Sequence, residues 1–156
     1  MPSATADRLT TNPGLFRFGL LIVAIPQLFV SGWALFAPRS FFDDFPGFGR
    51  EWVPPFGPFN EHFITDYGSF TLALAVMLII AAVMLDRRVV QVALVVWIVG
   101  ALPHFISHVT ETERFDTTDN VGNLGALALY IVVPALLLVL STRGGPDHGQ
   151  DRSGTA

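Results

Sequence analysis

The stretch that decides the fold is NEHFITDYGSFTLALAVMLIIAAVML, residues 60–85. Its last 19 residues carry no charged side chain, and about 20 apolar residues in a helix are enough to cross the ~30 Å hydrocarbon core of a bilayer. Asn60 is a residue type that favours the N-cap of a helix. We therefore predict a membrane-spanning helix that begins at Asn60 and carries three ionisable groups in its first two turns: Glu61, His62 and Asp66.

Three further apolar segments have a similar length. Together they predict four helices, at about residues 14–37, 60–85, 89–110 and 120–141. The composition agrees, because 51% of the 156 residues are hydrophobic and only 14% are charged, whereas a soluble domain carries about 25% charged residues. We predict an all-α fold, a four-helix transmembrane bundle over residues 13–141, with disordered cytoplasmic tails at 1–12 and 142–156.

The composition also argues against several classes of function. The sequence has no cysteine, which excludes disulfides, thiolate metal sites and thiol redox chemistry. The formal net charge of −4 offers no basic surface for nucleic acid, which we do not expect as a partner. The sequence contains no recognisable nucleophile motif and no glycine-rich phosphate loop. The sequence therefore does not favour an enzyme, and it identifies no catalytic residues.

The placement of the arginines predicts the orientation in the membrane, because cytoplasmic loops carry an excess of basic residues. If the N-terminus is cytoplasmic, three arginines lie outside: Arg39, Arg50 and Arg114. The other six then lie inside: Arg8, Arg17, Arg87, Arg88, Arg143 and Arg152. We therefore predict a multi-pass protein of the cell membrane with both termini cytoplasmic and its two long connections outside.

The connection between the first two helices, residues 38–65, is rich in proline, glycine and aromatic residues. It contains seven phenylalanines and Trp52, so it is too apolar for a disordered linker. We expect an ordered outer loop. Two compatible interpretations remain open: an interfacial cap whose rings lie at headgroup level, or a lid over a site between the helices.

Two pairs of ionisable residues have helical spacing, His62 with Asp66 and His104 with His108. Residues four apart share one face of a helix, and the two helices run in opposite directions, so we expect the pairs to converge near the outer membrane edge. Imidazole and carboxylate groups bind zinc, iron, manganese or copper. The four residues are therefore candidate ligands of a divalent metal, with Glu61 as a further ligand or as a partner of His62.

Other interpretations of this His/carboxylate cluster remain open. It is also explained as a hydrogen-bonded polar cluster that only fixes helix packing, which the spacing alone favours, or as a proton relay. A haem between His62 and His104 fits the spacing, but no haem motif accompanies it. Six further residues are expected to support the site from the neighbouring helices and the loop: Asn60, Asp44, Trp52, Gln27, Asn123 and Tyr130.

Several short motifs occur in a recognisable order. They are FFDDFPG at 41–47, Trp52, NEH at 60–62, DYG at 66–68 and PHFISH at 103–108. In this order they resemble a family of uncharacterised four-helix integral membrane proteins of actinobacteria, over about residues 15–140. More remotely, the architecture is similar to that of DoxX-like membrane proteins, some of which are associated with redox partners. The resemblance implies that eight positions match the family signature: Asp44, Trp52, Asn60, Glu61, His62, Asp66, His104 and His108. It implies no catalytic role for them.

Three functions follow from these observations. The first is a membrane protein with a His/carboxylate site at the outer edge, either metal-binding or an accessory to a redox or envelope process. The second is a structural or assembly subunit whose polar cluster locks helix packing. The third is a lipid or small-molecule binder that uses loop 38–65 as a lid. The expected partners are membrane lipid and either another membrane protein or a second copy of the chain.

Overall fold

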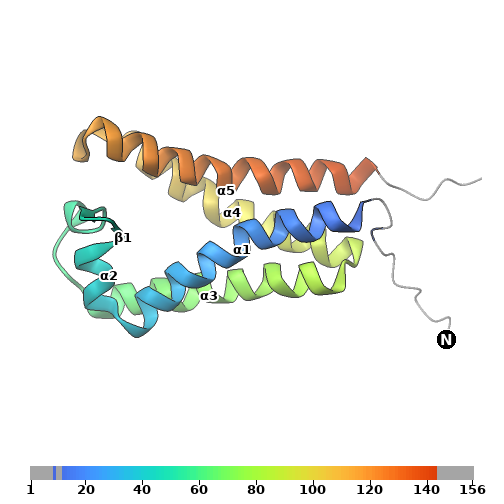
Figure 1. The fold of residues 1–156 in the computed structure, drawn as a ribbon, viewed down its shortest axis with the longest axis horizontal. Coiled ribbons are helices and arrows are strands. Elements are labelled where there is room, and N and C mark those ends of the chain that lie inside the picture. Colours follow the sequence, from blue (N-terminus) through green and yellow to red (C-terminus); the bar gives the residue numbers. More distant parts are fainter. Residues whose placement is uncertain (1–8, 10–11, 144–156) are drawn as a thin grey trace, which may run out of the picture.

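The structure is a computed structural model that describes residue 9 and residues 12–143. The chain is mostly helical, and four helices are long and apolar enough to cross a membrane, which confirms this part of the prediction (Figure 1). They are α1 (Pro13–Phe36), α3 (Glu61–Met84), α4 (Arg87–Thr110) and α5 (Thr117–Arg143). Most of the two expected tails lies outside the described residues. The exceptions are Leu9, which is buried and donates its N–H to Leu85 O, Asn12, which immediately precedes α1, and residues 142–143, which belong to α5.

The connection between α1 and α3 is more structured than the loop that we expected. It contains a short helix α2 (Pro38–Asp44), the paired strands β1 (Pro46–Gly47) and β2 (Arg50–Glu51), and a 3-10 turn η1 (Pro54–Phe56). Proline begins both α2 and η1, where a missing N–H costs nothing. We call residues 37–60 the cap. The end of the molecule that carries the cap and the turn η2 (Thr112–Arg114) is the cap end, and the other is the terminal end.

Side-chain caps set where three of the long helices begin. The Asn60 side chain accepts the N–H of Phe63 at 3.1 Å, as expected for the start of α3. Helix α4 begins two residues earlier than predicted, because Asp86 accepts two N–H groups of its first turn. Helix α5 begins three residues earlier than predicted. There Asp116 accepts the N–H of Asp119 at 2.8 Å, which caps the first turn of α5.

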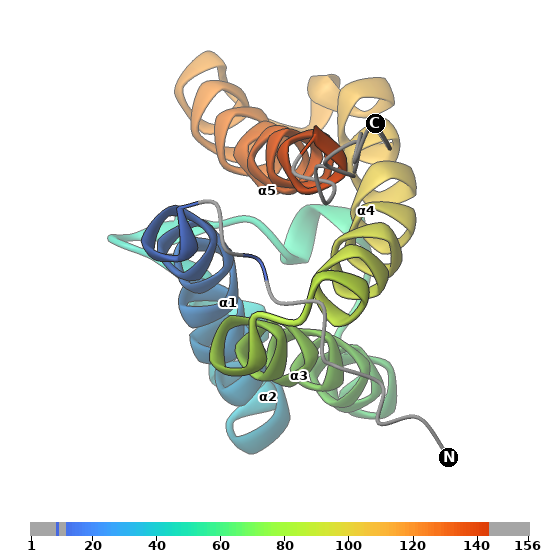
Figure 2. The same ribbon diagram turned by 90° about the vertical axis from the view of Figure 1, so that its right-hand side faces the viewer.

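The four long helices form two pairs, with α1 against α3 and α4 against α5. Viewed along the helices, α1 and α3 lie side by side, with α5 opposite them (Figure 2). A buried hydrogen-bond chain joins the first pair, running from Gln27 to Ser31 (3.0 Å) and on to Thr71 (2.9 Å). Gln27 is buried, as its mid-helix position predicted. In the second pair, Trp97 donates its indole N–H to Tyr130 O at 2.7 Å.

The hydrophobic core is divided into two clusters along the length of the molecule. The cluster nearer the terminal end draws buried residues from all four long helices: Phe16, Leu20, Val23, Ala24, Leu78, Ala81, Ala82, Val90, Ala93, Leu94, Trp97 and Leu137. The cluster nearer the cap end has three buried residues, Ala34, Phe41 and Ile64, and is completed by aromatic side chains of α1, α3 and the cap. Within the described residues, α4 and α5 contribute nothing to it, so other contacts must hold them at the cap end.

Candidate functional site at the cap end

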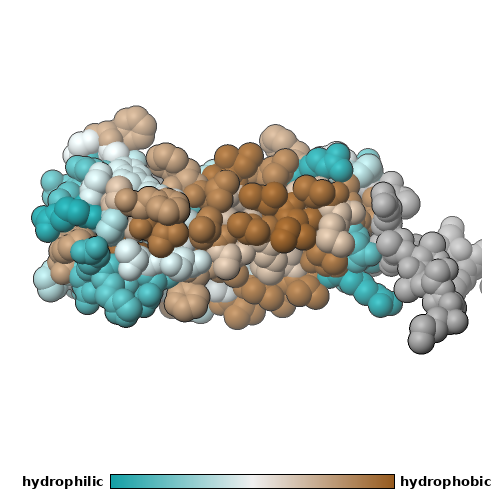
Figure 3. Space-filling view, turned by 90° about the horizontal axis from the view of Figure 1, so that it is seen from below, coloured by the Kyte–Doolittle hydropathy of each residue, from teal (hydrophilic) through white to brown (hydrophobic). Residues whose placement is uncertain are grey.

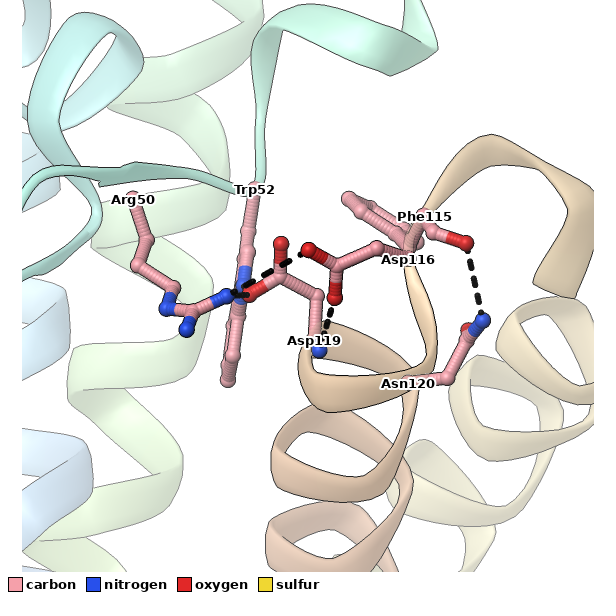
Figure 4. Close-up of polar contacts among 6 residues, drawn as sticks. All are labelled: Arg50, Trp52, Phe115, Asp116, Asp119 and Asn120. Carbon is pink, nitrogen blue, oxygen red and sulfur yellow. Dashed lines mark hydrogen bonds and ion pairs between the residues drawn. The ribbon is translucent and has the colours of Figure 1, made fainter.

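A single carboxylate on α5 holds the cap against the second helix pair. Asp119 Oδ1 accepts hydrogen bonds from Arg50 Nη1 at 2.6 Å and from the indole Nε1 of Trp52 at 2.8 Å (Figure 4). Its side chain is 17% exposed, and Asp116 Oδ2 lies 3.8 Å from the same arginine nitrogen. Charge-assisted bonds of this length are the strong ones among protein hydrogen bonds. Arg50 and Trp52 are thus fixed to the first turn of α5.

The Trp52 ring packs closely against α5 at Gly122. A Cβ atom built on Gly122 would lie 3.3 Å from the indole ring. On the cap side, the backbone N–H of Trp52 donates to Phe45 O at 2.7 Å, and the rings of Phe45 and Trp52 meet edge to face. Trp52 therefore connects the aromatic cluster of the cap to α5.

A second set of contacts joins the cap to the connection between α4 and α5. Arg114 donates from Nε to Glu111 and from Nη1 to Pro55 O, both at 2.9 Å. Its guanidinium also lies 5.3 Å from the centre of the Phe56 ring. Phe56 in turn contacts the rings of Phe115 and His108.

Beneath Phe56, α4 carries the two imidazoles that the sequence singled out. The rings of His104 and His108 meet edge to face with centroids 4.7 Å apart. His108 Nδ1 lies 3.0 Å from Nδ2 of Asn123, which is buried on α5. With the amide in this orientation Nδ1 accepts, so the neutral His108 ring carries its proton on Nε2.

His104 differs from His108 because it has no hydrogen-bond partner in the described part of the chain. Its ring contacts the ring of His108. It lies six residues before the end of α4 at Thr110, which is about 9 Å along the helix axis, and its side chain is exposed. A polar group at this depth of a membrane-spanning helix is costly unless something binds it.

The other candidate residues lie apart from this imidazole pair. His62 Nε2 is 3.4 Å from Asp66 Oδ2, but the side chains are 87% and 52% exposed, so this ion pair contributes little. Glu61 and Asp44 are also exposed, and Asp44 accepts a hydrogen bond from Ser40. Tyr130 and Gln27 lie deeper, in contact with Trp97 and Ser31 respectively.

The expected convergence of both pairs on one metal ion is not seen in the described residues. No three side chains among their histidines, aspartates and glutamates gather closely enough to hold a metal. The expected convergence requires α3 and α4 to stay side by side along their whole length, as far as the cap end. Because the cap-end core binds α3 to α1 and the cap only, α4 is not drawn toward α3 there.

The sequence did not point to Asp119, which accepts hydrogen bonds from two side chains of the cap. It also indicated no contact for Arg50 or Arg114. One signal could have found them: the α1–α3 connection carries Arg50 beside Trp52, while residues 111–119 of the α4–α5 connection hold four acidic residues. Opposite charges on two connections at one end of a bundle favour contact between them.

No protein-family model, curated protein or solved structure matches the chain.

Proposed function

We propose that this is a multi-pass protein of the cell membrane with both termini cytoplasmic and the cap outside. The charge distribution of the described residues supports this orientation. At the terminal end they include four arginines and one acidic residue, whereas the cap end has three arginines and nine acidic residues. An excess of arginine marks the cytoplasmic side of membrane proteins.

The function that this geometry supports best is binding of a small polar ligand at the His104–His108 pair, beneath the cap. One observation carries the proposal: His104 lies within an apolar helix, is exposed and has no hydrogen-bond partner in the described residues. Its ring and the Nε2–H of His108 supply both donors and acceptors to a ligand. Phe56 and the Asp119 contacts hold the cap over the pair.

A transition metal is the second candidate ligand. Two imidazoles four residues apart on a helix, with ring centroids 4.7 Å apart, provide two ligands for zinc or copper. The described residues offer no third His, Asp or Glu at this pair, so water or a second molecule would have to complete the coordination. The structural alternative, in which the imidazoles only lock the helices, needs no ligand.

Replacing each histidine by phenylalanine separates these functions. In His104→Phe an apolar ring replaces a polar group without a partner, so we expect the free energy of unfolding to stay the same or to rise by about 1 kcal/mol. In His108→Phe the buried amide of Asn123 loses its partner, and we expect a loss of about 1–3 kcal/mol. Thermal unfolding of the purified variants in detergent measures both.

The ligand is sought by native mass spectrometry of protein extracted from its own membranes, and metal binding is measured separately by titration with Zn²⁺. We expect wild type to carry a bound small molecule that His104→Phe loses. Zinc binding that both variants abolish would favour the metal instead. If wild type carries neither ligand and His104→Phe unfolds as readily as His108→Phe, the helix-locking role is correct and the binding proposal is wrong.

A further inference from the structure

At the opposite end of the molecule, which the proposed ligand site does not use, the described residues include more basic than acidic side chains. Of the described residues there, four are arginines: Arg17, Arg87, Arg88 and Arg143. Asp86 is the only acidic residue among them, and its carboxylate already accepts two N–H groups at the start of α4. No ion pair joins Arg17, Arg88 or Arg143 to any described residue.

Two of these arginines are held in place by hydrogen bonds to backbone oxygen atoms. Arg17 Nε on α1 donates to Ala82 O near the end of α3 at 3.1 Å. Arg87 Nη1 on α4 donates to Ser141 O near the end of α5 at 2.9 Å. Cations at the C-terminal ends of helices are also favoured by the helix dipole. Each contact links two helices and places a guanidinium at their shared edge.

Exposed apolar side chains occur close to the arginines in the sequence. Phe18 beside Arg17 is 65% exposed, and Val83 and Met84, just before the turn into α4, are 72% and 50% exposed. Figure 3 shows a hydrophobic band between two hydrophilic ends on one face of the molecule. The terminal end therefore combines two features. Its apolar surface suits acyl chains, and its fixed cations lie at the level where lipid headgroups begin.

From this arrangement we infer that the terminal end binds the phosphate of anionic phospholipids through Arg17, Arg88 and Arg143. A guanidinium forms paired hydrogen bonds with phosphate oxygens, and a basic residue next to an anionic membrane surface contributes about 1 kcal/mol. A lipid satisfies both halves of the surface, whereas a free anion satisfies only the arginines. The cap end, with nine acidic residues and three arginines, repels the same headgroups.

The test uses the full chain in detergent micelles with phosphatidylglycerol or phosphatidylcholine of identical acyl chains, and native mass spectrometry counts the bound lipid. We expect wild type to prefer phosphatidylglycerol. The triple variant Arg17→Gln, Arg88→Gln, Arg143→Gln should bind it about 100-fold more weakly, since each arginine contributes about 1 kcal/mol. Arg39→Gln is the matched control, because Arg39 lies at the cap end, and it should keep the preference.

The double variant Arg88→Gln, Arg143→Gln keeps the Arg17–Ala82 contact, so it tests the inference even if the triple variant fails to fold. Its affinity for phosphatidylglycerol should fall about 30-fold, because two arginines at about 1 kcal/mol each are removed. Equal binding of the two lipids by wild type would overturn the inference, and so would a double variant that binds phosphatidylglycerol as wild type does. Displacement of the lipid by excess inorganic phosphate would identify a free-anion site instead. None of these outcomes depends on a ligand at His104.

Discussion

The substitution Gly68→Ala should destabilise the protein by about 1–3 kcal/mol, although alanine is the better helix former. A Cβ atom at Gly68 on α3 would lie 2.9 Å from the Leu35 nitrogen, 3.0 Å from Ser31 O and 3.1 Å from Leu35 Cβ. Two of these three atoms belong to the α1 backbone, which cannot rotate aside as a side chain can. The helices must separate, and overpacking of this kind costs more than the ~1 kcal/mol that alanine gains in a helix.

Gly125→Ala on α5 is the matched control, because nothing lies within 4 Å of a Cβ atom built there. We expect it to be neutral, or more stable by up to about 1 kcal/mol from helix propensity. Thermal unfolding in the same detergent compares the two variants with wild type. If Gly68→Ala unfolds no earlier than Gly125→Ala, α1 and α3 do not pack as closely as the structure shows.

The sequence predicts the helices, but it does not predict close contacts between them such as the one at Gly68. The apolar runs have the length of a membrane span, and Asn60 has the chemistry of an N-cap, so the positions of four helices followed from local properties. The burial of Gln27 also followed, because an amide in the middle of an apolar helix needs a protein partner. In the structure it donates to Ser31.

The functional site was harder to predict because it depends on how the helices pair. Helical spacing correctly places His104 beside His108 and His62 beside Asp66, since both are relations within one helix. Whether the two pairs meet is decided by the angle between α3 and α4, and this depends on the aromatic core that binds α3 to the cap. No local pattern in the sequence encodes that angle. Asp119 was missed for the same reason, because its partners are 67 and 69 residues away in the chain.

The substitution Asp119→Ala should release the cap from α5 while leaving the rest of the fold in place. It removes the acceptor of both the Arg50 and the Trp52 hydrogen bonds, and no shared hydrophobic core replaces them at this end. We expect backbone amides in residues 45–56 to exchange about tenfold faster with deuterium, because segments held by few contacts open locally. Hydrogen exchange followed by mass spectrometry measures this directly. Peptides from residues 75–94, in the core shared by four helices, should exchange as in wild type.

The control for this experiment is Asp43→Ala, which removes a carboxylate of the cap itself. Its ion pair with Arg39 is exposed at the surface, so its loss should leave exchange in residues 45–56 unchanged. Arg50→Ala should accelerate exchange less than Asp119→Ala, because Trp52 keeps its acceptor. The double variant of Arg50 and Asp119 should then exchange no faster than Asp119→Ala alone, since both changes remove the same contact. Additive effects, or an effect of Asp43→Ala equal to that of Asp119→Ala, would contradict the role of the Asp119 carboxylate in holding the cap against α5.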